Sequence, residues 1–198
     1  MLALWLSLAW ASPTTVIAVG DGVVAAGSPG AEAVSGWVSG LADCLQEESP
    51  GNYTVVDRQG TVVSVEQVGA WIRGIQKERR VVVLLGAGWS EGRASLDRSQ
   101  LTRLIKGLRA LSRPPAEVFV VSPVRAPSSV SAAEGSGLTA LARSPGVTLV
   151  DPSASLMPSG PGAMWSEGPV LSAQGHAAVA ATVCDALRAW NDAPVESP

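Results

Sequence analysis

One serine, one aspartate and the single histidine of the chain occur in an order that could support nucleophilic catalysis. Ser90 lies in the motif Gly-Trp-Ser-Glu-Gly, which fits the nucleophile-elbow pattern, and Asp151 and His176 follow in the α/β-hydrolase order. In such a triad the histidine takes the serine proton and the aspartate orients the histidine. The motif has low specificity in a chain with 21 glycines, and two residues separate it from the apolar run before it. A triad of these residues is therefore a secondary hypothesis.

A second candidate site lies near the start of the chain, where a turn breaks an apolar run. Residues 15–19 are β-branched or apolar without polar alternation, which is typical of a strand buried on both faces of a parallel sheet. Gly20, Asp21 and Gly22 follow directly. Open α/β folds place their ligand sites at the carboxyl ends of such strands. We expect Asp21 to organise this turn by accepting backbone N–H hydrogen bonds.

This stretch resembles the first block of the SGNH/GDSL hydrolases, which reads apolar strand, Gly-Asp-Ser, then a small-residue turn ending in glycine. Gly20 and Asp21 match the block, and Gly27 ends the turn. Gly22 stands at the position of the nucleophilic serine. The resemblance thus implies the fold of these hydrolases and, at Gly22, the loss of the nucleophile.

The second and third blocks of the family match in spacing but differ at their functional positions. After the second apolar run, Val62 stands at the glycine of the oxyanion hole, unless a shifted loop uses Gly60, and Ser64 opens the next helix. After the third run, Gly88 stands at the asparagine and Trp89 at the second acid. Both blocks therefore lack the donors that would stabilise an oxyanion.

The last block resembles the segment Asp-x-x-His-Leu-Ser-x-x-Gly-His, which opens the final helix in the family. Glu167 replaces the aspartate and Val170 replaces the catalytic histidine, whereas the Leu-Ser and Gly-His pairs are kept. The resemblance assigns His176 to the structural position at the helix start. Because nucleophile, base and oxyanion donors are lost together, we expect an inactive family member, a pseudoenzyme.

The same positions suggest what the former active site could bind. Asp21, Gly22 and Gly88 would leave a site with small side chains, flanked by Trp89 and Trp165. A tryptophan on a loop offers a flat apolar face that stacks on sugar rings or holds an acyl chain. We expect this site to bind a glycan, an acylated ligand or a protein partner.

Two other interpretations remain open. In the first, the chain is an active carboxylic-ester hydrolase or acyltransferase, with Ser90 or Ser64 as nucleophile and His176 as base. In the second, Trp89 and Trp165 fold inward and fill the vacated site, so that the domain has only a structural or interaction role. A serine hydroxyl within hydrogen-bond reach of the histidine ring would favour the first interpretation.

Composition and charge limit the class of partner. The 198 residues are 46% hydrophobic and 16% charged, with 14 basic and 17 acidic residues and a net charge of −3, which is typical of a single globular domain. There is no basic stripe or nucleic-acid-binding motif, so we expect no nucleic-acid partner. We also expect a monomer without a cofactor or a metal ion.

The first residues of the chain favour export. Residues 1–11 form an apolar run that ends in Ala-Trp-Ala, which is similar to a signal-peptidase site. The run lacks a basic start and is short, so a frayed apolar N-terminus is the alternative. No other run approaches the length of a membrane span. We expect residues 1–11 to be a signal peptide and the mature protein to be periplasmic or extracellular.

Cys44 and Cys184 are the only cysteines, which excludes an all-cysteine zinc site. They fall on the first and last expected helices, which lie on the same face of a sheet with flavodoxin-like order. Both a disulfide and two separately buried thiols remain open, and export would favour the disulfide.

Alternating strands and helices predict a single α/β domain over residues 12–192, followed by a flexible tail over 193–198. The expected strands are 15–19, 53–57, 81–85, 118–121 and 147–150, in a parallel sheet of order 2-1-3-4-5 within a three-layer α/β/α fold. The expected helices are 31–48, 64–79, 101–111, 131–142 and 172–191, with a long loop over 151–171. Three tryptophans on helical stripes are expected in the core, namely Trp37, Trp71 and Trp190.

Overall fold

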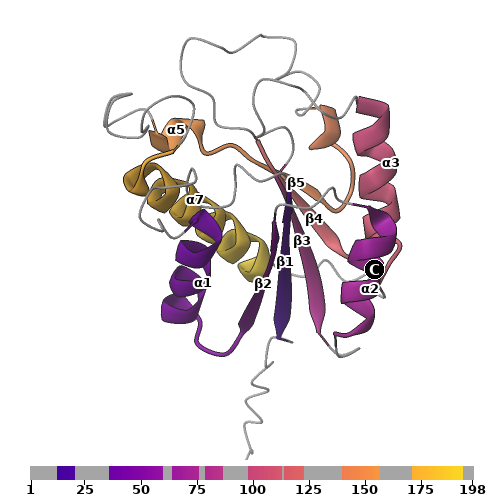
Figure 1. Ribbon diagram of the computed structural model, residues 1–198, viewed down its shortest axis with the longest axis horizontal. Helices are drawn as coiled ribbons and strands as arrows, with labels where there is room; N and C mark the ends of the chain where they lie inside the picture. Colours follow the sequence, from indigo (N-terminus) through magenta and orange to yellow (C-terminus); the bar gives the residue numbers. More distant parts are fainter. Residues whose placement is uncertain are drawn as a thin grey trace, which may run out of the picture.

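Five strands form one parallel sheet in the computed structural model of the chain (Figure 1). The structure describes residues 13–20, 36–59, 64–75, 79–86, 98–112, 114–122, 140–156 and 171–193. The order β2-β1-β3-β4-β5 is the one expected from the sequence, and all four strand pairings are parallel. The strands are β1 (Thr14–Gly20), β2 (Tyr53–Gln59), β3 (Arg80–Gly86), β4 (Glu117–Val121) and β5 (Val147–Val150).

Helices cover both faces of this sheet, which makes the predicted three-layer fold (Figure 1). On one face lie α1 (Trp37–Glu48) and α7 (Ala173–Asp192), and on the other lie α2 (Val65–Arg73) and α3 (Arg98–Arg109). The short α5 (Ser153–Leu156) follows β5 and contacts α7. Each helix runs back from the carboxyl edge of the sheet, so the next strand again points toward that edge.

The central strands are mostly apolar because both of their faces are buried. Along β1, Val16 and Ala18 pack under α1 and α7, whereas Ile17 and Val19 pack under α2 and α3. The same alternation along β3 supplies both layers, and its residues from Val81 to Leu85 are at most 8% exposed. Side chains of successive strand residues point to opposite faces, so one unbroken apolar run builds two cores.

Some boundaries differ from those expected. Helix α2 ends at Arg73 and not at 79, because Gly74 forms its C-cap. Strand β2 extends to Gln59 because it stays paired with Gly20 at the end of β1. Within the expected loop 151–171, residues 153–156 form α5. Of the expected helix 131–142, only residues 140–142 fall within the described residues, and residues 140 and 141 are helical.

Two of the three tryptophans expected in the core lie at its margin. Trp37 is only 2% exposed, but Trp71 and Trp190 are half-buried and each carries an arginine on its ring. The guanidinium of Arg58 lies 5.7 Å from the Trp71 ring centroid, and that of Arg80 lies 3.9 Å from the Trp190 centroid. An indole between core and solvent can bury one face and stack a cation on the other.

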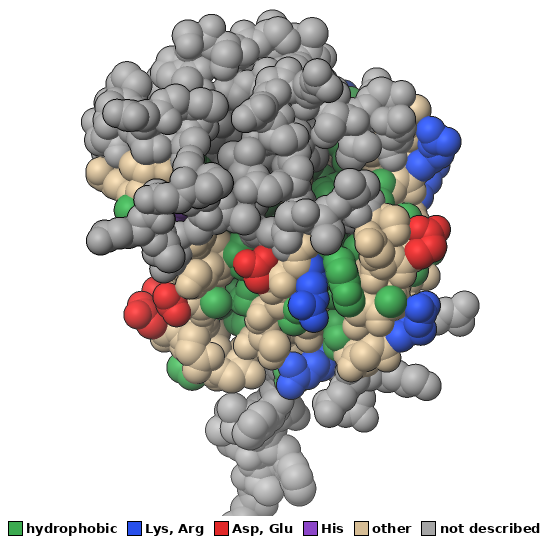
Figure 2. Space-filling view, viewed as in Figure 1, with side chains coloured by type: hydrophobic (Ala, Val, Ile, Leu, Met, Phe, Trp, Pro, Cys, Tyr) green, Lys and Arg blue, Asp and Glu red, His purple; other side chains and the backbone are tan. Residues whose placement is uncertain are grey.

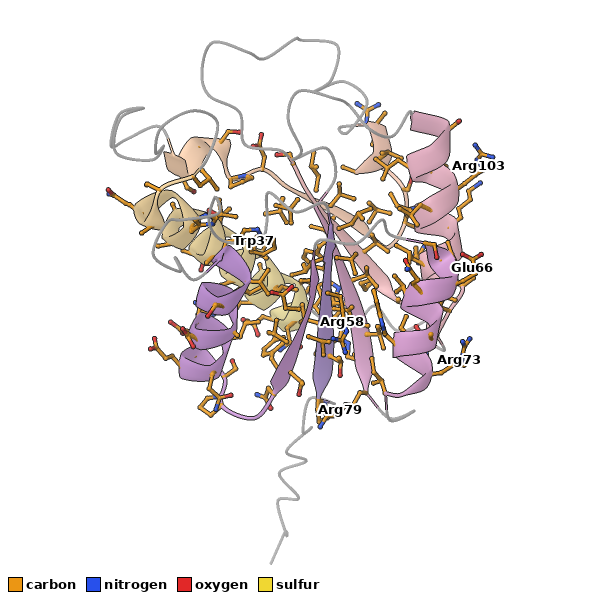
Figure 3. The ribbon with its side chains drawn as sticks, in the orientation of Figure 1. Trp37, Arg58, Glu66, Arg73, Arg79 and Arg103 are labelled. Atoms are coloured by element: carbon orange, nitrogen blue, oxygen red, sulfur yellow. A yellow bond between two sulfur atoms is a disulfide. The ribbon has the colours of Figure 1, made fainter. Side chains whose placement is uncertain are left out.

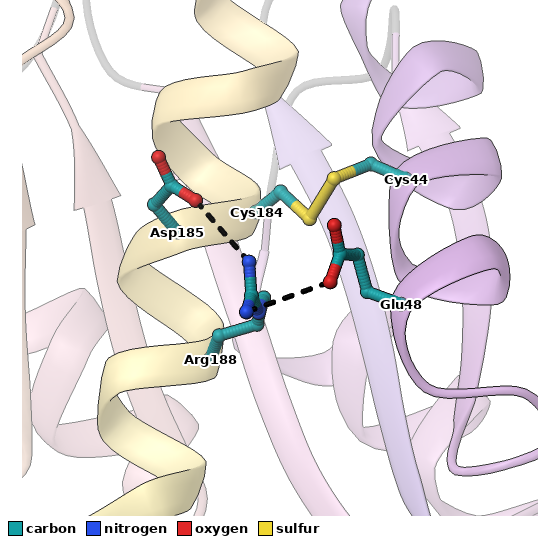
Figure 4. Close-up of polar contacts among 5 residues, drawn as sticks. All are labelled: Cys44, Glu48, Cys184, Asp185 and Arg188. Carbon is teal, nitrogen blue, oxygen red and sulfur yellow. Dashed lines mark ion pairs between the residues drawn. A yellow bond between two sulfur atoms is a disulfide. The ribbon is translucent and has the colours of Figure 1, made fainter.

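Three contacts join α1 to α7, and in each of them the two residues are 140 positions apart in the chain. The first is the contact of Gly40 with Ala180. The other two are the disulfide Cys44–Cys184 and the ion pair of Glu48 with Arg188 at 3.5 Å, both shown in Figure 4. We call this set the helix contact ladder. A Cβ on Gly40 would lie 3.2 Å from that of Ala180, so the glycine allows the helices to approach closely. The structure thus contains the disulfide, which the sequence left open.

The described surface carries charges of both signs and no single-sign patch on the face in view. Acidic and basic side chains are interspersed there (Figure 2). Among the helices in the described part of the chain, none combines the length and apolar character needed to cross a lipid bilayer.

Candidate functional site

The carboxyl edge of the sheet is the place where the predicted site residues should meet. Strands β1 and β3 are neighbours, and their last residues, Gly20 and Gly86, are register partners. The last described residues before Gly22 and Gly88 are therefore neighbours at the end of the sheet. The neighbouring β2 ends at the same level, since Gln59 pairs with Gly20. The ends of β1, β2 and β3 thus meet at one edge, where the sequence predicts the shared site.

Most of the predicted site residues themselves lie outside the described residues. This set comprises the altered catalytic positions, the expected binding residues and the elbow serine: Asp21, Gly22, Val62, Gly88, Trp89, Ser90, Trp165, Glu167 and Val170. The described candidates are Ser64, Asp151 and His176, together with the two disulfide cysteines.

Asp151 lies directly after β5, as expected, and is bonded to its own loop and to the end of β4. Its Oδ1 accepts hydrogen bonds from the Ser122 hydroxyl at 3.1 Å and from the Ser153 amide at 3.0 Å. Burial raises the pKa of this carboxyl, but the hydrogen bonds from Ser153 and Ser122 outweigh burial, so the pKa lies below its ordinary value. Asp151 is thus an ionised acceptor at neutral pH.

Ser122 is a residue of this edge that the sequence analysis missed. It is only 8% exposed, its amide donates to the carbonyl of Val150 at 2.9 Å, and its hydroxyl donates to Asp151. The available signal was positional, because Ser122 and Asp151 are the first residues after two strands that the predicted order makes neighbours. Together the two residues join the ends of β4 and β5.

His176 lies in the first turn of α7, where the resemblance placed it. Ser172 caps this helix: its hydroxyl accepts from the Gly175 amide at 3.1 Å, and its carbonyl accepts from the His176 amide at 2.9 Å. The His176 side chain is 4% exposed, and its Nδ1 is buried without a hydrogen-bond partner in the described part of the chain. Burial holds the pKa of His176 below its ordinary value of 6.5, so the ring is neutral at pH 7.

Ser64 acts as the N-cap of α2. Its hydroxyl accepts from the Gln67 amide at 3.2 Å, and the Gln67 side chain accepts from the Ser64 amide at 3.2 Å, which completes a capping box. This matches the sequence-based expectation that Ser64 opens the helix. Its hydroxyl oxygen is therefore engaged with the backbone.

Within the described ranges, no three acidic, histidine or cysteine side chains come together in a way that could hold a metal ion. Near the carboxyl edge, the described polar groups include the hydroxyls of Ser64 and Ser122, the Asp151 carboxylate and the buried His176 imidazole.

Solved esterase structures share this architecture. Est24, a carbohydrate acetylesterase from Sinorhizobium meliloti, superposes with a TM-score of 0.62 at 14% identity, covering 89% of this chain and 99% of its own. TesA gives 0.66 at 20% identity with coverages of 89% and 99%. A lipolytic protein of the G-D-S-L family from Veillonella parvula gives 0.63 at 15% identity with coverages of 88% and 98%.

These similarities define the class of fold. The chain has the α/β fold of the SGNH/GDSL hydrolases, as its motifs indicated. No protein-family model matches the sequence, and no curated protein is similar to it at a significant level.

Proposed function

We propose that this chain is a non-catalytic SGNH-fold domain that binds a glycan, an acylated ligand or a protein partner at the carboxyl edge of its sheet. The observation that carries the proposal is the burial and hydrogen bonding of the only histidine. His176 is buried, and its Nδ1 has no partner among the described residues. In a working triad this nitrogen donates to a carboxylate, which fixes the tautomer and stabilises the imidazolium.

The carboxylate of the hypothetical triad, that of Asp151, is hydrogen-bonded to other residues. Oδ1 of Asp151 accepts from Ser122 and Ser153, and Nδ1 of His176 is not bonded to this carboxylate. The sequence changes at the family's serine, asparagine and histidine positions also support a non-catalytic role. A retained hydrolase scaffold whose sequence is expected to place Trp89 and Trp165 beside the site could bind a ligand without turnover.

Export belongs to the same proposal. A disulfide between Cys44 and Cys184 persists in oxidising compartments and is rare in cytosolic proteins. Together with the apolar run at residues 1–11, it supports a periplasmic or extracellular location.

The test is a hydrolysis assay with p-nitrophenyl acetate and p-nitrophenyl butyrate, run beside a binding screen against glycans and acylated ligands. We expect no turnover above the buffer rate, and binding that is lost in Trp89→Ala. Hydrolysis abolished by Ser90→Ala and by His176→Ala would contradict the proposal. It would instead support the second function, an ester hydrolase or acyltransferase that uses Ser90, for which the esterase neighbours are the favouring observation.

A further inference from the structure

The basic residues of the chain are concentrated in one segment. Residues 64–113 contain ten of the 14 basic residues but only four of the 17 acidic residues. This segment therefore carries a net charge of +6, and the rest of the chain carries −9. It includes α2, β3 and α3. The net charge of −3 conceals this division, because it averages over the whole chain.

The two helical layers of the fold differ in charge accordingly. Helix α3 contains four basic residues and no acidic residue, and α2 adds Arg73 and Glu66. On the opposite face of the sheet, α1 contains three acidic residues and no basic residue. Helix α7 contains two acidic residues and Arg188, which pairs with Glu48 and Asp185. One layer is thus basic and the other acidic, and a view that includes both shows mixed charges (Figures 1 and 2).

The exposed cations of the basic layer are not neutralised by acidic side chains. Arg73, Arg103 and Lys106 are exposed. Arg73 and Arg103 point outward from the layer in Figure 3. Arg103 and Arg109 donate hydrogen bonds to backbone carbonyls, which leave their charge in place. Among the described residues, the ion pairs lie in the acidic layer, and none joins these four cations to a carboxylate.

The basic layer forms one face because its two helices pack closely. A Cβ on Gly107 of α3 would lie 2.7 Å from the Val65 side chain of α2. A Cβ on Gly69 of α2 would lie 3.0 Å from the side chain of Leu111, which follows α3. Neither contact leaves room for a larger side chain. The outer side chains of α2 and α3 thus stand on a shared face and do not form the walls of a groove.

Such a face suits an anionic membrane surface. Lys and Arg side chains close to anionic lipids each strengthen binding about fivefold, and lipid head groups move laterally to meet cations that no rigid site holds in place. A polyanionic chain such as a single-stranded nucleic acid binds instead along a basic groove with aromatic stacking platforms. The acidic layer would repel a chain that wrapped around the protein, but it lies away from a membrane that contacts the basic layer.

We propose that the basic layer of α2 and α3 docks on a membrane surface that contains anionic lipids, with the acidic layer of α1 and α7 facing away from it. The attachment is electrostatic and peripheral. The inference goes beyond the proposed function, because it concerns a helical face of the sheet and not the carboxyl edge. It holds whether that edge binds a ligand or hydrolyses an ester.

Vesicle co-sedimentation of the full, disulfide-bonded chain is the measurement. Vesicles of phosphatidylcholine alone are compared with vesicles of equal parts phosphatidylcholine and phosphatidylglycerol. We expect binding to the anionic vesicles only. Binding should be lost when the salt concentration rises from about 0.05 M to about 0.5 M, because salt screens charges at the protein surface.

Two double variants test whether the basic layer makes the contact. Arg103→Gln with Lys106→Gln removes two exposed cations from α3, and we expect about 30-fold weaker binding to anionic vesicles. The matched control is Ser39→Glu with Gln46→Glu on the exposed face of α1. It changes the net charge by the same amount in the acidic layer, and its binding should stay within about threefold of wild type. Circular dichroism and urea unfolding check that both variants are folded.

Each other outcome would contradict the proposal in a distinct way. No binding of the wild-type chain at low salt, or equal binding to both kinds of vesicle, would overturn it without any variant. Equal losses in the two double variants would assign the binding to net charge and not to the basic layer. Binding to dextran sulfate but not to vesicles would identify a polyanionic chain as the partner. If the chain binds anionic vesicles and also hydrolyses esters, the docking face stands and only the non-catalytic function fails.

Discussion

At the scale of single residues, the described polar groups near the carboxyl edge make structural contacts. The Ser122 hydroxyl donates a hydrogen bond to Asp151, and the Ser64 hydroxyl accepts one from a helix amide. The His176 side chain is buried. The structural role of His176 at the helix start could be predicted from the Gly-His motif. Its unpartnered Nδ1 could not, because that depends on side chains from distant parts of the chain.

Ser122→Ala should destabilise the protein by about 1 kcal/mol, because it removes a buried donor to an ionised carboxylate. The measurement is the urea midpoint followed by circular dichroism at pH 7. Ser39→Ala, on the exposed face of α1, is the matched control and should leave the midpoint unchanged. Equal midpoints for wild type and Ser122→Ala would show that the hydrogen bond to Asp151 contributes nothing.

The stability of the protein should fall as pH decreases below 6.5, the ordinary pKa of histidine. The folded state holds the pKa of His176 below this value, so the unfolded chain binds the proton more readily, and stability rises with pH in the window between the two pKa values. The free energy of unfolding should decrease by about 1.4 kcal/mol for each unit by which folding lowers the pKa of His176.

The measurement is urea unfolding at several pH values between 5 and 8, with His176→Leu as the comparison. Asp151 does not contribute in this window, because its pKa is lowered from a value that is already acidic. The variant should therefore lack the loss below pH 6.5. A parallel decline in wild type and variant would assign the pH dependence to other groups.

At the scale of elements, the helices differ in how their N-termini are capped. Ser64 and Ser172 cap α2 and α7 with their hydroxyls, whereas α1 begins at Gly36 without such a cap. The two serine caps could be predicted, because a capping serine before an apolar periodic run is a local signal. The end of α2 could not be placed correctly, because the apolar stripe continues to Ile75 beyond the C-cap.

Ser64→Ala should lower the free energy of unfolding by about 0.5–2 kcal/mol, because it removes half of the capping box of α2. Thermal or urea unfolding measures this change, with Gln46→Ala on the exposed face of α1 as control. Unchanged stability together with the loss of any ester hydrolysis would instead identify Ser64 as a nucleophile.

At the scale of the whole molecule, a parallel sheet with helices on both faces could be predicted from apolar runs that alternate with helical stripes. The strand order could be predicted from the resemblance to the SGNH/GDSL hydrolases. The contact of Ser122 with Asp151 could not, since it requires the register in which Val121 pairs with Val150. The α1–α7 pairing follows from the same topology. It places on one face two cysteines that are 140 positions apart.

The double variant Cys44→Ala, Cys184→Ala should lose about 2–5 kcal/mol of stability, because the disulfide restricts a long segment of the unfolded chain. Urea unfolding of the oxidised wild type and the double variant measures the difference. Glu48→Gln is the control from the same helix contact ladder. Its ion pair joins half-exposed side chains, so the loss should be below about 1 kcal/mol. Equal stability of wild type and double variant would show that the bridge is dispensable.

The disulfide also divides the chain into a covalent ring and two open arms. The ring from Cys44 to Cys184 contains β2, β3, β4 and β5, whereas β1 lies outside it on the N-terminal arm. A single protease cut anywhere within the ring therefore leaves one covalent molecule, whose pieces separate only after reduction. The central strand β1 stays in place through its neighbours β2 and β3 and through α1, which links its arm to the ring.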